Sequence, residues 1–127
     1  MKHIPASKGR FVPASHEDAA RPGVLKRVIA TCSEIKLGQV MMVNWARLPA
    51  GNSFRRHYHE DMQEIFILVQ GQARLTVEGT NVDMSVGDTV IVDAREIHEM
   101  LNPGDSDAEY IVFGVSSGHG GQTVVVP

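Results

Sequence analysis

Cysteine is almost absent from this sequence: Cys32 is the only one, so no disulfide can form within the chain. A secreted scaffold built on disulfides is therefore excluded, and we expect Cys32 to be a small buried hydrophobe in a strand. No stretch is long and apolar enough to span a membrane, and Met1–Pro5 lacks the apolar run of a signal peptide. These absences predict a cytoplasmic protein with no membrane partner.

A strong charge of either sign is also lacking. The 127 residues include 12 Lys and Arg and 15 Asp and Glu, which gives a formal net charge of −3. Nucleic acid attracts proteins that carry clustered positive charge, so we expect no nucleic-acid partner. The length is typical of one domain that buries its core without disulfides. We expect a polar N-terminal arm over residues 1–23, either mobile or forming a strand that needs a partner, and a single domain over residues 24–127.

Helical periodicity is scarce, and short apolar, β-branched runs separated by turn residues make up most of the chain. The expected strands are Val24–Ala30, Val40–Leu48, Ile65–Val69, Ala73–Val77, Thr89–Val92, Ala108–Val115 and Thr123–Val126. Their regular spacing predicts an all-β sandwich or barrel. A single helical turn is expected at Ser15–Ala20, where a capping pattern is followed by Pro22 and Gly23.

Two imidazoles and a carboxylate have the spacing of a metal site. In a strand, His57 and His59 leave the same face, about 7 Å apart. Glu64 follows a four-residue break that is long enough to reverse the chain, and His98 can complete the set from a distant strand. Neutral imidazole and carboxylate suit divalent transition metals, so we expect one ion of Fe, Mn, Ni, Zn or Cu per chain.

The sequence around these residues resembles the cupin family. The first cupin motif matches at Gly51, His57, His59, Glu64 and Gly71. The second matches at Gly87, His98 and Asn102. The resemblance implies a double-stranded β-helix, also called a jelly-roll β-barrel, with the three histidines and Glu64 as metal ligands. Asp93 and Arg95 stand where the second motif usually has Pro and Gly. Because Arg adopts a positive φ only at a cost, we expect a different type of turn there.

Arg55 is a candidate for binding substrate. It shares the parity of His57 and His59, so it would face the metal cavity if the strand began before it, and could there anchor a substrate carboxylate by a bidentate pair. The alternative is that Arg55 bends to solvent at the start of the strand.

Four other polar residues are assigned no role in the site. His3, His16 and His119 lie among turn residues without ligand spacing, so we expect them to be solvated or disordered. Asn102 precedes Pro103 and is expected to form a turn rather than to act in catalysis.

The run Ile65–Val69 is apolar on both of its faces. Its even-numbered residues share the face of Glu64 and should point inward, whereas Ile65, Ile67 and Val69 should point outward. An outward apolar face must be covered by a second sheet or by another subunit. Cupins are usually dimers or larger, so the resemblance implies a homodimer.

The resemblance leaves the function open between three classes. We expect a dioxygenase acting on a small oxygenated, anionic metabolite ahead of a metal-dependent isomerase, epimerase or decarboxylase of a sugar or keto acid, in which the metal is a Lewis acid. The third class is a non-catalytic small-molecule-binding module, so enzymatic activity itself stays open. A second acid or base in the pocket, apart from the ligands, would favour the isomerase over the dioxygenase.

Overall fold

The computed structural model describes residues 1–118 and 120–127, and within them it contains strands and turns but no helix. The strands are β1 (Val12–Pro13), β2 (Leu25–Thr31), β3 (Val40–Leu48), β4 (His57–His59), β5 (Met62–Gln70), β6 (Ala73–Val77), β7 (Thr80–Met84), β8 (Thr89–Val92), β9 (His98–Leu101), β10 (Ala108–Ser116) and β11 (Thr123–Val125). The predicted all-β class is confirmed.

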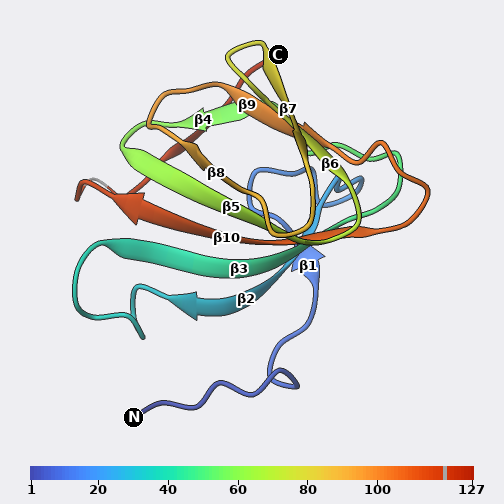
Figure 1. Ribbon diagram of the computed structural model, residues 1–127. Coiled ribbons are helices and arrows are strands. Elements are labelled where there is room, and N and C mark those ends of the chain that lie inside the picture. The colour runs from blue at the N-terminus through green and yellow to red at the C-terminus, as the bar shows by residue number, and fades with distance from the viewer. Residues whose placement is uncertain (119) are drawn as a thin grey trace.

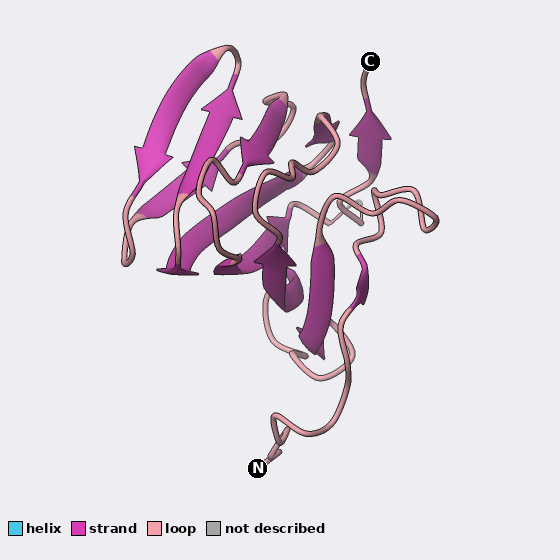
Figure 2. Cartoon of the chain, turned by 90° about the vertical axis from the view of Figure 1, so that its right-hand side faces the viewer, coloured by secondary structure: helices cyan, strands magenta, loops and turns pink. Residues whose placement is uncertain are grey.

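The strands form two antiparallel sheets that face each other (Figure 1). The larger sheet has the order β1-β2-β3-β10-β5-β8, and the smaller has the order β11-β4-β9-β6-β7. Neighbouring strands are therefore often distant in sequence, as in a jelly roll. Figure 2 shows the sheets from the side, with the N-terminal residues extending away from them. The predicted double-stranded β-helix is confirmed.

The core lies between the sheets and is built by alternation along the strands. On β5, the side chains of Met62, Glu64, Phe66 and Leu68 are buried, whereas Ile65 and Ile67 are only partly covered. The same alternation runs along β10, the central neighbour of β5, from Ala108 to Ser116. The predicted inward face of this run is therefore confirmed, and it brings Glu64 into the interior.

Part of the segment before β2 packs against the sheets, whereas residues 1–10 are mostly exposed and extend away from them. Val12 pairs with Lys26 of β2. This part of the segment therefore agrees with the second of the two expectations, a strand that pairs with a partner strand. Residues 14–21 form two separate turns, with Glu17 N donating to Ala14 O and Arg21 N donating to Asp18 O. The predicted helical turn is wrong, because Asp18 Oδ1 takes the N–H of Ala20 and these short turns replace a helical pattern.

Two further local expectations are wrong. Cys32 is exposed, because it lies in the turn that follows the last residue of β2. Arg95 has a φ of 70°, the left-handed conformation that was expected to be avoided there. Its N–H donates to His59 O at 2.8 Å and its guanidinium donates to Glu60 Oε2 at 2.7 Å. These contacts hold Arg95 in the conformation that a Gly would adopt without strain.

Candidate metal site and adjoining cavity

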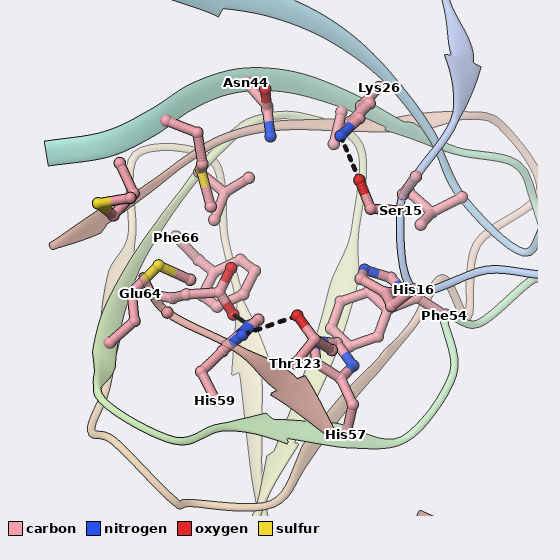
Figure 3. Close-up of a pocket in the computed structure, with 18 of the residues that line it drawn as sticks. Ser15, His16, Lys26, Asn44, Phe54, His57, His59, Glu64, Phe66 and Thr123 are labelled. Carbon is pink, nitrogen blue, oxygen red and sulfur yellow. Dashed lines mark hydrogen bonds and ion pairs between the residues drawn. The ribbon is translucent and has the colours of Figure 1, made fainter. Parts of the chain in front are cut away.

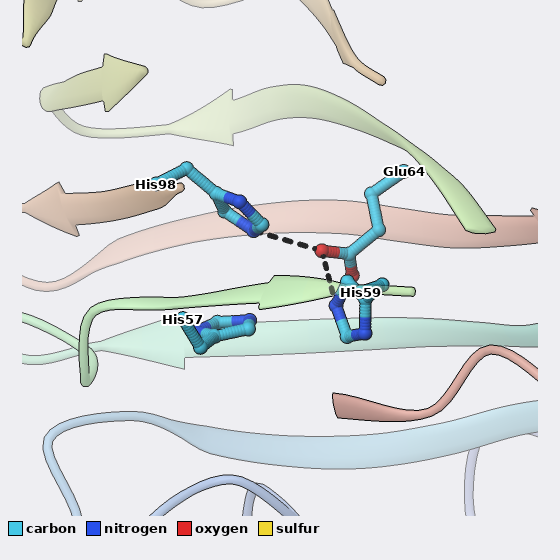
Figure 4. A group of neighbouring side chains, drawn as sticks. All are labelled: His57, His59, Glu64 and His98. Carbon is cyan, nitrogen blue, oxygen red and sulfur yellow. Dashed lines mark hydrogen bonds and ion pairs between the residues drawn. The ribbon is translucent and has the colours of Figure 1, made fainter. Parts of the chain in front are cut away.

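The four predicted ligands come from three strands and meet between the two sheets (Figure 4). His57 and His59 lie on β4, and His57 pairs directly with His98 on β9 of the same sheet. Glu64 approaches from β5 in the opposite sheet. The alternation along β4 and the return of the chain into β5 therefore produce the cluster that the spacing predicts.

The donor atoms of this cluster lie close together and are buried. Glu64 Oε1 is 2.8 Å from His59 Nε2 and 3.0 Å from His98 Nε2. One donor atom from each of the four residues lies within 4.8 Å of the others. All four residues are at least nine-tenths buried. This arrangement could hold a metal ion.

Hydrogen bonds on the far side of the rings orient the imidazoles. His57 Nδ1 lies 2.5 Å from Arg55 O, and His98 Nδ1 lies 2.9 Å from Glu96 O. A carbonyl oxygen only accepts, so both Nδ1 atoms carry a proton, and both Nε2 atoms face the cluster, where they would bind a metal once unprotonated. His59 Nδ1 contacts Thr123 Oγ1 at 3.1 Å in a similar position. The donor set and its supports therefore fit a divalent transition metal.

The protonation states of His57 and Glu64 also suit metal binding. Burial lowers the pKa of His57 to about 3, with the neighbouring His16 and His98 adding to the effect, so the ring is neutral at neutral pH. Burial alone would raise the pKa of Glu64, but hydrogen bonds from His59 and His98 outweigh it and hold this pKa well below its usual range. Neutral imidazoles and an ionised carboxylate are the forms that bind metals.

A cavity of about 320 Å³ adjoins His57, His59 and Glu64. Much of its wall is apolar, with contributions from Met41, Met42, Met62, Phe54, Phe66 and Val112. Its polar residues beyond the predicted ligands are Ser15, His16, Lys26, Asn44, Tyr110 and Thr123. An apolar pocket with a few polar groups beside a candidate metal site is typical of small-molecule binding. Figure 3 shows how these side chains surround the space.

His16 lies in this wall, so the expectation that it is solvated or disordered is wrong. Its ring stacks on His57 with centroids 4.2 Å apart, and its Nδ1 lies 2.8 Å from Glu17 Oε2. Its spacing in the sequence carries no signal of this position. By contrast, His3 is exposed, as expected. The expectation for His119 lies outside the described residues.

Lys26 and Asn44 were not identified from the sequence, although each leaves a signal there. Lys26 is charged within the run Val24–Ala30, and Asn44 is polar within Val40–Leu48, at the parity of the buried Ala46. A polar residue at an inward position of an apolar strand is a candidate for a site. Burial lowers the pKa of Lys26.

Of the two alternatives for Arg55, the structure agrees with the one in which the side chain turns to solvent. Arg55 is exposed and borders a surface groove with Arg21 and Arg56, and it does not line the cavity. The alternation of side chains along a strand does not apply to Arg55, because β4 begins only at His57. Its N–H donates instead to Glu17 Oε2 at 2.8 Å.

Asn102 forms a turn, as predicted. Its Nδ2 donates to Leu48 O at 2.9 Å and to Ser106 O at 2.8 Å, and its Oδ1 accepts from Gly104 N at 2.9 Å. The side chain is fully buried and joins the end of β9 to the end of β3. It supports the fold and does not line the cavity.

In the described part of the chain, no helix has the length and apolar character needed to cross a membrane. The cytoplasmic location expected from the sequence stays a prediction.

Comparison with known proteins identifies several relatives. A curated oxalate-binding protein from Thermotoga maritima is 32% identical over 65 residues, which cover 51% of this chain and 54% of that protein, so the chain matches about half of its length. A crystal structure of a predicted oxalate decarboxylase from Thermotoga maritima superposes with a TM-score of 0.79 at 22% identity, covering 91% of this chain and 99% of the other.

A second solved structure with a similar fold has a different described activity. It is a sugar phosphate isomerase of the cupin superfamily from Silicibacter pomeroyi, with a TM-score of 0.74 at 23% identity, covering 91% of this chain and 76% of the other. At such identities the superpositions show the fold alone. The family model for the cupin domain matches residues 44–114, more than half of the chain, and this range includes all four predicted ligands. The chain belongs to the cupin domain family.

Proposed function

We propose that this protein is an enzyme that binds one divalent transition-metal ion per chain through His57, His59, Glu64 and His98 and acts on a small oxygenated, anionic metabolite. The supporting observation is that three of these four residues also line the cavity. A metal held there would have protein ligands on one side and space for a substrate on the other. Such an open side distinguishes catalytic from structural metal sites.

The residues that line the cavity favour isomerisation, epimerisation or decarboxylation of a sugar or keto acid over the dioxygenase expected from the sequence. When bound, the metal would supply Lewis-acid polarisation of a carbonyl oxygen. This chemistry also needs a group that moves protons, and His16 lines the cavity beside His57. Its Nδ1 lies at hydrogen-bond distance from Glu17, a pairing that orients a general base.

The names of the relatives support this range of substrates. Two of them are described by oxalate, a small carboxylate, and one by a sugar phosphate. All of these compounds present anionic oxygens to a protein. The oxalate-binding relative also favours a second candidate from a different class, a module that binds a small acid without converting it.

The test compares metal-loaded and metal-free protein with 2-oxo acids and aldose sugars in deuterated water. Proton NMR would detect deuterium exchange or product formation, and an oxygen electrode would run in parallel. We expect deuterium exchange that depends on the metal and consumes no oxygen. The His16→Asn variant should lose this exchange. Oxygen consumption would identify a dioxygenase instead, and metal-dependent binding without exchange or product would identify the binding module.

We also propose that the chain forms a homodimer through the outer face of its larger sheet. Ile91 on β8 is 59% exposed and pairs with Ile65 on β5, which is only partly covered. Phe113 on β10 lies on the other side of Ile65 and is also partly covered. These neighbours make an apolar outer face that a second copy of the chain would cover.

A further inference from the structure

Three polar side chains lie across the cavity from the predicted metal ligands. Figure 3 shows Asn44, Lys26 and Ser15 on one side of the space, with His57 and His59 on the opposite side. They come from three segments: Ser15 precedes β2, Lys26 lies on β2 and Asn44 lies on β3. Because these segments are adjacent at the edge of the larger sheet, the fold gathers a second polar group in an otherwise largely apolar wall.

Asn44 is the most informative of the three. It is only 7% exposed, and in the described part of the chain its buried Oδ1 has no hydrogen-bond partner. Its inward neighbours are apolar: Ala46 lies on the same strand, β3, and Val112 lies at the paired position of β10. A buried amide without a partner lowers stability and is rare in folded proteins. An unpaired amide oxygen at this place is explained if a ligand in the cavity brings a donor, such as a hydroxyl, to it.

Lys26 supplies a positive charge at the same place. Its Nζ donates to Ser15 Oγ at 2.7 Å, and no carboxylate in the described residues forms an ion pair with it. An ammonium has three donors, so two remain for another acceptor. The partial burial that lowers the pKa of Lys26 also means that a nearby anion would be favoured.

The volume of the cavity indicates the size of the ligand that it can hold. A volume of about 320 Å³ corresponds to roughly ten water molecules at ~30 Å³ each. Oxalate has only six non-hydrogen atoms, so it would fill one end of this space. A ligand that contacts both the metal side and Lys26 must be longer.

We propose that Lys26, Ser15 and Asn44 form a subsite for the distal anionic oxygen group of a longer substrate, whose other end chelates the metal. The substrate class is then a hydroxy or oxo acid with a second carboxylate, or a sugar phosphate, and not a two-carbon diacid. Lys26 binds the charge, Asn44 Nδ2 donates to the same group, and Asn44 Oδ1 accepts from an adjacent hydroxyl where the ligand has one. This assignment rests on the proposed function, since it takes the metal ligands as the first binding point.

Calorimetric titration of the metal-loaded full chain tests the subsite with paired compounds. Each pair differs in its distal charge: 2-oxoglutarate against 2-oxopentanoate, and ribose 5-phosphate against ribose. We expect the compound with the distal charge to bind at least tenfold more tightly than its partner in one of the two pairs. If this is the oxo-acid pair, the subsite binds a carboxylate, and if it is the ribose pair, the subsite binds a phosphate. In Lys26→Met this preference should disappear, while oxalate binds as in the wild type. Arg55→Met removes the same charge outside the cavity and should keep the preference.

Asn44→Leu gives an independent test. It replaces the unpaired amide with an apolar group of similar size, so the unliganded protein should be as stable as the wild type or more stable, while the charged compound binds at least fivefold more weakly. A purely structural Asn44 would show the opposite, a loss of stability with binding unchanged, and would be removed from the subsite by that result.

The outcomes separate this subsite from the metal site. Oxalate binding with no preference in either pair, or a preference that survives in Lys26→Met, overturns the subsite and leaves the metal site in place. Failure to take up metal overturns the proposed function. In that case the same pairs are titrated into metal-free protein, where a preference that depends on Lys26 still supports the subsite and equal binding within each pair overturns it.

Discussion

The His16 ring stacks on the His57 ring, with centroids 4.2 Å apart and planes inclined by 24°. This contact joins a turn near the N-terminus to a predicted metal ligand on β4. Glu17, the next residue, accepts hydrogen bonds from Gly23 N at 2.6 Å and Arg55 N at 2.8 Å, which ties the same turn to the chain leading into β4. The N-terminal segment is therefore part of the site wall.

The first prediction concerns metal content. His57→Ala and His59→Ala should each lose most of the bound metal, because each removes one of only four ligand atoms at the predicted site. Elemental analysis of the purified variants measures this directly. His3→Ala is the matched control, because His3 is exposed. This variant should retain one ion per chain. Equal metal content in the wild type and a His57→Ala, His59→Ala double variant would contradict the assignment.

The second prediction concerns the stability supplied by Glu17. Burial alone would raise its pKa, but hydrogen bonds from His16, Arg55 and Gly23 outweigh it, so the pKa lies below 4.5 in the folded state. Glu17→Gln should lower the free energy of unfolding at pH 7 by about 1–2 kcal/mol, because an amide accepts these bonds less strongly than a carboxylate. Urea denaturation measures the difference, and Asp105→Asn, at an exposed carboxylate, should change little.

The pH dependence of this stabilisation has a defined sign. A carboxylate with a lowered folded-state pKa stabilises the protein above its unfolded-state pKa, and the effect is lost as the pH falls through the folded-state value. The difference in stability between wild type and Glu17→Gln should therefore be constant from pH 7 to about 5.5 and shrink below 4.5. A difference that grew on acidification would contradict the role given to Glu17.

The third prediction concerns the close approach of Gly23 to the chain before β4. A Cβ on Gly23 would lie 1.9 Å from Ser53 O and 2.8 Å from Glu17 Oε1, so the backbone would have to move. Gly23→Ala should cost about 2–3 kcal/mol of stability in thermal or urea unfolding. Gly38→Ala is the comparison: its Cβ would meet nothing within 4 Å, and only its positive φ should cost about 1 kcal/mol. Equal losses in both variants would refute the steric argument.

The fourth prediction concerns assembly. If a second copy covers the outer face around Ile91, light scattering at micromolar concentration should give twice the chain mass of 13.9 kDa. Ile91→Glu should shift the protein to the single-chain mass, because a carboxylate would be buried in the interface. Leu37→Glu changes a residue that is 90% exposed in a loop and should leave the dimer intact. A wild type that scatters as a single chain would rule out this interface.

Much of the fold follows from local patterns in the sequence. The runs Val40–Leu48 and Ala73–Val77 form β3 and β6 with the predicted bounds, because alternating burial and β-branched residues specify a strand locally. β7 was missed as a strand, since Glu78–Gly79 is a tight two-residue turn and both residues have a positive φ. β7 begins with Thr80 and Asn81, which extend the turn pattern, and its apolar residues Val82 and Met84 come only later in the strand.

The sequence by itself predicted the all-β class and the four candidate ligands, because strand periodicity and short-range spacing bring His57, His59 and Glu64 together and the resemblance to the second cupin motif adds His98. Only the tertiary structure decided which other groups meet them. His16, Lys26 and Asn44 reach the cavity through strand pairing and turns that join distant segments, and Arg55 leaves it because β4 begins two residues later. These positions depend on backbone hydrogen bonds between segments far apart in sequence, which no local pattern records.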